Sequence, residues 1–284
     1  MFRQTYKATL KNLFRSGLFW FMVALLIGIA FYSGIEGFQL NTKIHPITGE
    51  IKMVKDNSPE YVLGYGVYIK RIINSVLLVM NYAMPLIAVV STVLILNRDY
   101  GDNFYEIEKG AGISPAAYFF GRIAALITVN FPLVVIASFI SFHTYIITRG
   151  GISEMGALYY ITDSSIRLMR IIVLVAFPAI LFYIGVTFLL GCLFRSGMSA
   201  SIVSIAYIVF NKIQPRLREF IPQLYEEYFS PLPNKLTTYL YWYDTYEFNT
   251  NLSLKDATLA FLFQPTIFFI TLILSYVFVR KRDK

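Results

Sequence analysis

The chain has 284 residues, of which 56% are hydrophobic and only 15% charged, and its mean hydropathy is +0.58. This composition excludes a soluble domain, because apolar runs of about 18 or more residues need a membrane to cover them. The single cysteine, Cys192, excludes an intrachain disulfide, and the net charge of +8 fits contact with anionic lipid headgroups at least as well as contact with nucleic acid.

The first sixteen residues predict an amphipathic helix that lies in the membrane interface. Its basic residues repeat every four positions, and they are Arg3, Lys7, Lys11 and Arg15. Aromatic and leucine side chains line an adjoining face, so the bases would face headgroups and the aromatics acyl chains. The competing interpretation, a cleaved signal peptide, is disfavoured because the following apolar run is too long and no small-x-small cleavage site follows it.

Six membrane spans are expected, in an all-α polytopic fold that forms a single transmembrane domain over residues 1–284. Their approximate bounds are 18–37, 72–97, 116–147, 171–193, 198–210 and 257–279. The fifth has only some thirteen residues, short of the roughly 20 needed to cross. Of the two external segments, 38–71 and 212–256, the second is therefore expected to re-enter the membrane before the last span.

Charge predicts the orientation of these spans. The segments 1–17, 98–122, 193–198 and 280–284 hold 12 of the 25 Lys and Arg residues and only 5 of the 17 acids. Because Lys and Arg near the spans face the cytoplasm, both termini and the segment between the second and third spans are predicted to be cytoplasmic.

The segment 98–117 predicts a short helix with marked ends. Asp102 or Asn103 is placed to cap its first turn, and Gly110 and Gly112 permit the left-handed backbone that ends it. Ser114 then caps the next helix, with Pro115 in its first turn. An ordinary solvated loop is the alternative interpretation.

Residues of this short helix are expected to divide into two faces. Phe104, Tyr105 and Ile107 would form a small apolar edge, while Glu106, Glu108 and Lys109 would face water. A short helix held tightly between two spans is suited to being displaced by a bound partner.

The same stretch resembles the cytoplasmic loop of permease subunits in type-2 ATP-binding-cassette (ABC) exporters. The likeness rests on Glu106-x-x-x-Gly110, on Ile113-Ser-Pro115 and on Tyr118-Phe-Phe-Gly-Arg122, where the family usually has Lys in place of Arg. It implies a coupling helix that docks into an ATPase subunit through Asn103, Phe104, Tyr105, Glu106, Ile107, Glu108 and Lys109. The order of spans also matches, although many such permeases lack the large first external segment.

Motifs for catalysis are missing from the sequence. No Gly-x-x-x-x-Gly-Lys-Ser/Thr occurs, so ATP and Mg²⁺ would be bound by a separate ATPase chain and not here. His45 and His143 lie far apart, and no metal-ligand spacing occurs. The acidic pair Glu226-Glu227 fits a solvated helix face better than an intramembrane protease. The chain is therefore not expected to be an enzyme.

These observations predict the permease subunit of an ATP-driven exporter in a bacterial plasma membrane, working as a dimer of identical or paralogous permeases. No charge is expected in mid-span for ion coupling, which favours power from a separate ATPase. The lining offers no charge for a small ionic solute, so an amphipathic peptide or a hydrophobic molecule is the expected substrate. The resemblance places the path at Asn81, Met84, Ser201, Ser204 and Tyr207, although Ser201 and Ser204 suit helix packing equally well. A non-transporting membrane scaffold or sensor, which binds a partner through its external loops, is the alternative.

Overall fold

A computed structural model describes residues 1–36, 42–44, 51–53, 79, 83–148, 176–217 and 254–282. These residues form eight helices and one pair of strands: α1 (Phe2–Arg15), α2 (Gly17–Glu36), β1 (Thr42–Ile44), β2 (Ile51–Met53), α4 (Met84–Gly101), α5 (Phe104–Gly110), α6 (Pro115–Thr148), α8 (Phe177–Phe194), α9 (Gly197–Leu217) and α12 (Leu254–Arg282).

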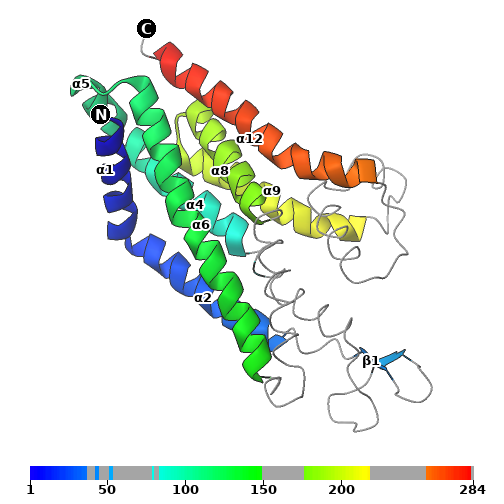
Figure 1. Cartoon of the computed structure of the whole chain (residues 1–284). Helices are drawn as coiled ribbons and strands as arrows, with labels where there is room; N and C mark the ends of the chain where they lie inside the picture. Colours follow the sequence, from blue (N-terminus) through cyan, green and yellow to red (C-terminus); the bar gives the residue numbers. More distant parts are fainter. Residues whose placement is uncertain are drawn as a thin grey trace.

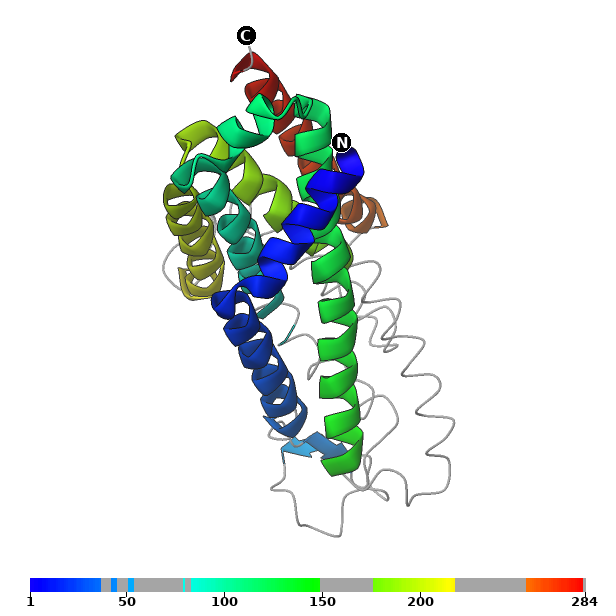
Figure 2. The same cartoon turned by 90° about the vertical axis from the view of Figure 1, so that its left-hand side faces the viewer.

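The helices pack into one elongated bundle. α6 packs against α1 and α2, α12 packs against α8, and α4 contacts α8 and α9 (Figure 1). Both ends of the chain and α5 lie at one end of the bundle, and the β1–β2 pair lies at the other (Figures 1 and 2). The bundle is therefore polarised, with the short helix α5 at the same end as the termini.

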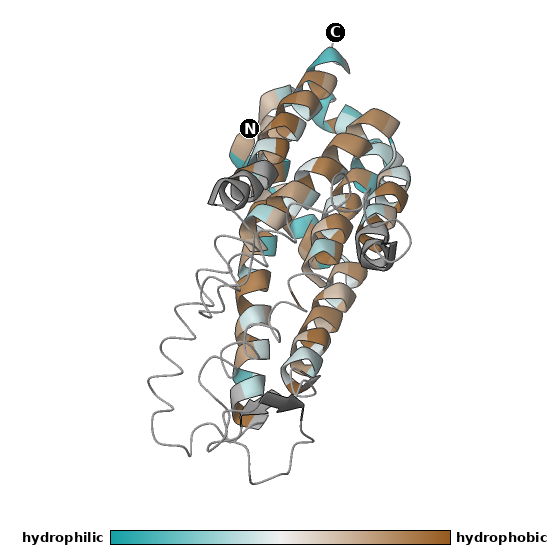
Figure 3. Cartoon of the chain, turned by 90° about the vertical axis from the view of Figure 1, so that its right-hand side faces the viewer, coloured by the Kyte–Doolittle hydropathy of each residue, from teal (hydrophilic) through white to brown (hydrophobic). Residues whose placement is uncertain are grey.

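Three helices are long and apolar enough to cross a membrane, at Gly17–Ile35, Pro115–Tyr145 and Phe177–Phe194. Much of the helical ribbon has the colour of hydrophobic residues (Figure 3). The large hydrophobic side chains that are exposed include Phe21, Ile202 and Ile273. Exposed apolar side chains on this scale need lipid or another chain as neighbour. The fold is thus helical and compatible with a membrane. Within the described residues, the ends of α2, α6 and α8 lie close to the expected ends of the spans.

The fifth expected span is longer than predicted. α9 continues to Leu217, so its 21 residues are enough in length to cross a bilayer, whereas a helix ending near residue 210 was expected. Its apolar part is nonetheless short, at Gly197–Val209. The start of the expected external segment 212–256 is therefore helical, and its region 218–253, with the predicted re-entrant turn, lies outside the described residues.

The expectation of a purely helical chain needs one correction. β1 and β2 pair antiparallel within the segment 38–71 that is expected to be external, with Lys43 opposite Lys52. Thr42, Ile44 and Ile51 are β-branched residues, which favour this pairing.

One side of α1 is buried against the bundle, which the amphipathic pattern did not predict. Arg3, Lys7, Lys11 and Arg15 are exposed, as expected, but Thr5, Thr9 and Leu13 are buried. The close approach of α1 to α6 requires Gly121, because a Cβ there would lie 2.9 Å from the Cβ of Thr5. α1 is thus packed against the bundle as well as presenting its bases outward.

Candidate functional site

The short helix in the segment 98–117 forms as predicted, but its N-terminal cap differs. Asn103 adopts a left-handed backbone (φ 53°) and its side chain makes no capping hydrogen bond; instead its carbonyl accepts from the amide of Glu106 at 3.1 Å. At the other end, Gly112 has the expected positive φ of 78°, whereas Gly110 is still helical. Ser114 caps α6 as predicted, because its Oγ accepts from the amide of Ala117 at 3.3 Å.

The two faces of α5 are not those expected. Glu108 was predicted to face water but is only 6% exposed, and Tyr105 is buried beside it. Ile107 was assigned to the same apolar edge as Tyr105, yet it points outward and is 61% exposed. Phe104 is half-buried, with the guanidinium of Arg98 at 4.5 Å from its ring centre. The exposed surface of α5 is therefore formed by Asn103, Glu106, Ile107, Lys109 and Gly110.

Behind α5 lies a buried cluster of three charges. Arg122, on α6, is 1% exposed and forms two hydrogen bonds with the carboxylate of Asp99, from Nη2 at 2.7 Å and from Nε at 3.2 Å. Its Nη2 also donates to Glu108 at 3.1 Å, and its Nη1 donates to the Oγ1 of Thr9 at 2.6 Å. One arginine side chain thus joins α6 to α4, α5 and α1.

Helical spacing brings the partners together. Tyr118 precedes Arg122 by one turn of α6, so both side chains lie on one face, and the Tyr118 hydroxyl donates to Asp99 at 2.6 Å. The ring of Tyr105 packs edge-on against that of Tyr118, with ring centres 4.8 Å apart. Two aromatic residues therefore enclose the cluster, and a paired arrangement of this kind is what makes buried charges tolerable.

The cluster carries one more carboxylate than guanidinium. Burial raises the pKa of the Glu108 carboxyl, the Arg122 guanidinium opposes that rise, and the negative charge of Asp99 adds to it. Because Asp99 holds two of the arginine's hydrogen bonds, Glu108 is the more weakly held of the two acids. The contact between α5 and the bundle is thus the part of the cluster most easily altered.

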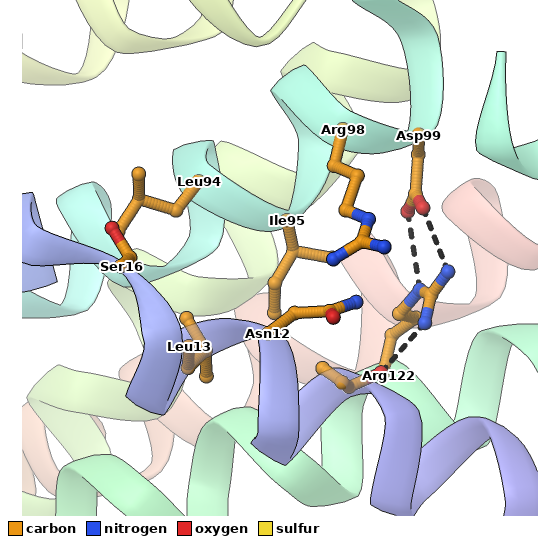
Figure 4. Close-up of a pocket in the computed structure, with 9 residues that line it drawn as sticks. Asn12, Leu13, Ser16, Leu94, Ile95, Arg98, Asp99 and Arg122 are labelled. Atoms are coloured by element: carbon orange, nitrogen blue, oxygen red, sulfur yellow. Dashed lines mark hydrogen bonds and ion pairs between the residues drawn. The ribbon is translucent and has the colours of Figure 1, made fainter. Parts of the chain in front are cut away.

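A cavity of about 190 Å³ adjoins the cluster on the side of α1 and α4. Figure 4 shows the guanidinium of Arg98 and the amide of Asn12 pointing into the same space, with the Asp99–Arg122 pair beside them. The lining residues are Thr9, Asn12, Leu13, Ser16, Leu94, Ile95, Arg98, Asp99 and Arg122.

The described residues that were predicted to line the substrate path differ in their surroundings. Met84 is buried, and the hydroxyls of Ser204 and Thr187 are 2.9 Å apart across α9 and α8, which is a packing role. Ser201 Oγ donates to the carbonyl of Met198 in its own helix, while Tyr207 is exposed on α9. Asn81 lies outside the described residues. Helix packing therefore accounts for Ser204, and the path remains a prediction.

Among the described residues, no three His, Cys, Asp or Glu side chains are grouped to bind a metal ion. Of the two histidines, His45 lies outside these residues, and His143 is exposed with its Nδ1 at 2.8 Å from the carbonyl oxygen of Phe139.

The fold and the cluster define a class: a helical protein with apolar helices suited to a membrane and a polar junction at the end of the bundle that carries the termini. No protein-family model matches the chain, and no curated protein matches it.

Proposed function

We propose that this chain is the membrane-spanning permease subunit of a type-2 ABC exporter, located in a bacterial plasma membrane. Energy would come from ATP and Mg²⁺ bound by a separate ATPase subunit, and the permease would act as a dimer of identical or paralogous chains. The substrate class that fits best is an amphipathic peptide or another hydrophobic molecule, because the expected path offers no charge for a small ion.

The observation that supports this proposal most is the double connection of α5. Its outer surface is exposed, with Ile107 projecting from it, while Glu108 on its inner surface is hydrogen-bonded to Arg122. Arg122 in turn holds Asp99, so a displacement of α5 reaches α4 and α6 together. A docking surface on one side and a shared ion-pair cluster on the other suit a helix that transmits movement.

A further contact extends this connection to the last helix. The hydroxyl of Tyr105 lies 3.5 Å from the carbonyl oxygen of Val279 on α12. Movement of α5 would therefore also bear on the end of α12, which packs along α8. The short helix is thus attached to several of the long helices of the bundle through buried side chains.

The test separates docking from transmission with two variants of α5. Ile107→Asp places a charge in the outer surface, and we expect loss of copurification with the ATPase and loss of export. Glu108→Ala leaves the outer surface intact, and we expect retained copurification with reduced export and reduced substrate-stimulated ATP hydrolysis. Burying an isoleucine side chain contributes roughly 1.5–3 kcal/mol, so the loss of ATPase affinity should be about tenfold or more.

Ile147→Asp is the matched control, since Ile147 is similarly exposed at the opposite end of α6. It should insert and bind the ATPase like the parent. If all three variants bind and export like the parent, or if no ATPase copurifies with the parent, the exporter proposal fails and a non-transporting scaffold or sensor becomes the better interpretation.

A further inference from the structure

The cavity between α1 and α4 contains polar groups that the ion-pair cluster leaves unused. Arg98 forms no direct ion pair with a carboxylate among the residues that the structure describes, although its positive charge also acts on Asp99 and Glu108, and its guanidinium lies over the ring of Phe104. Asn12 is half-buried, and no described residue accepts or donates a hydrogen bond to its amide. Asp99 also lines this space, but its oxygens already accept hydrogen bonds from Arg122 and Tyr118. The cavity therefore offers a cation and an amide donor to a ligand.

The elbow between α1 and α2 gives the cavity a third donor. Ser16 lies between the two helices, and its Oγ accepts from the amide of Phe19 at 3.3 Å, which leaves the hydroxyl proton free to donate. A guanidinium, an amide and a hydroxyl around one space are groups that bind phosphate oxygens. Leu13 and Leu94 make the rest of the wall apolar, as suits a phosphate with a hydrocarbon attached.

The same elbow carries features of a membrane interface. Trp20, one turn beyond Ser16, is 52% exposed, and its Nε1 donates to the carbonyl of Phe14 at 2.8 Å. Phe14 and Leu18 are also exposed beside it. Tryptophan at an apolar surface next to basic residues is typical of the headgroup level of a bilayer. Residues typical of the headgroup level of a bilayer thus lie at the elbow that borders the cavity.

We propose that the cavity lined by Asn12, Ser16 and Arg98 is a binding site for the phosphate of an anionic phospholipid headgroup. The lipid would sit between α1 and α4, with its phosphate on Arg98 and its acyl chains along the exposed apolar residues of the elbow. The site needs a membrane but no ATPase, so it stands apart from the exporter proposal. A bound lipid would fill the space beside the cluster that fixes α1 to the bundle.

The test uses Trp20 as reporter in the full-length chain carrying Trp242→Phe, since the sequence has two tryptophans. The protein is placed in bilayers of phosphatidylcholine with a fixed fraction of brominated phosphatidylglycerol or, in parallel, brominated phosphatidylcholine, and the quenching of Trp20 is compared. We expect the parent to prefer phosphatidylglycerol. Arg98→Gln should lower this preference by about tenfold, as expected for loss of a charge-assisted hydrogen bond.

Arg15→Gln is the control, because it removes an equal charge from the same region without lining the cavity. It should leave most of the preference intact. Asn12→Leu keeps every charge and removes no hydrogen bond among the described residues, so this variant should fold normally. It should nevertheless lose the preference for phosphatidylglycerol. Equal effects of Arg98→Gln and Arg15→Gln, no effect of Asn12→Leu, or no preference in the parent would each overturn the proposal.

A last arm distinguishes the lipid from free phosphate. Inorganic phosphate is titrated into the phosphatidylglycerol bilayers at constant ionic strength. Unchanged quenching supports the lipid as occupant. Relief of quenching in the parent, absent from Arg98→Gln, would assign the site to soluble phosphate and overturn the lipid assignment.

Discussion

Arg122→Met tests whether the buried cluster holds the end of the bundle together. The substitution keeps an unbranched apolar side chain but removes the guanidinium, which leaves Asp99 and Glu108 buried without their cation. Removing one partner of a buried ion pair costs about 3–5 kcal/mol, because the remaining charge is uncompensated. We therefore expect the free energy of unfolding to fall by about this amount at neutral pH.

Protonation of Glu108 sets an independent limit on the share of this loss that Glu108 contributes. From its ordinary pKa of 4.5, protonating Glu108 at about pH 7 costs about 3 kcal/mol, at about 1.4 kcal/mol per pH unit. The penalty carried by Glu108 cannot exceed that figure, since the carboxyl would otherwise become neutral. The destabilisation by Arg122→Met should accordingly shrink as the pH is lowered toward 4.5.

The measurement is reversible unfolding in mixed micelles, with Arg280→Met as control. Arg280 is exposed on α12, so its replacement should change the free energy of unfolding by no more than about 0.5 kcal/mol. Adding Asp99→Asn and Glu108→Gln to Arg122→Met removes the orphaned charges and keeps an acceptor for Tyr118. This triple variant should recover at least half of the loss. An Arg122→Met protein as stable as the parent, or a triple variant no better than the single one, would refute the reasoning.

Three further predictions concern the same end of the bundle and its orientation. Because the pKa of Glu108 is raised in the folded protein, its neutral form contributes stability that is fully present below about pH 4.5 and is lost as the pH rises through the folded-state pKa. Glu108→Gln carries no titrating group and does not lose this stability. Unfolding titrations should therefore show the stability of Glu108→Gln relative to the parent rising with pH. Gly121→Val brings a side chain against Thr5 and should detach α1 from α6, seen as faster hydrogen exchange in α1 with unchanged exchange in α8. In a cysteine-free background, a cysteine at Lys7 should be shielded from impermeant thiol reagents in intact cells and one at Lys52 labelled; the reverse pattern would overturn the predicted orientation.

Sequence patterns predicted the helices of this chain well. Long apolar runs fixed α2, α6 and α8 to within a few residues of their observed ends in the described regions, and Gly112 and Ser114 marked the end of α5 and the start of α6. These features depend on local composition and backbone preference, which one sequence contains in full.

The cluster at Arg122 was missed for a physical reason. The charged residues of the short segment between spans, Glu108 included, were predicted to face water. The sequence of an isolated helix does not show which elements pack against it. Three residues could have indicated the cluster. Asp99 and Arg122 are opposite charges at the ends of adjacent expected spans, and Thr9 places a hydroxyl between the basic residues of α1. The length of α9 was missed because polar residues at its end were taken to stop a helix that continues to Leu217.

The order of the cluster along the chain bears on how the protein is made. Thr9, Asp99 and Glu108, the three partners of Arg122, all precede it in the sequence. When α6 leaves the ribosome, every group needed to neutralise its arginine has therefore already been synthesised. The charge can be paired as the helix inserts, without waiting for the C-terminal half. Assembly of α1, α4, α5 and α6 is thus possible as an early unit, onto which α8, α9 and α12 are added later.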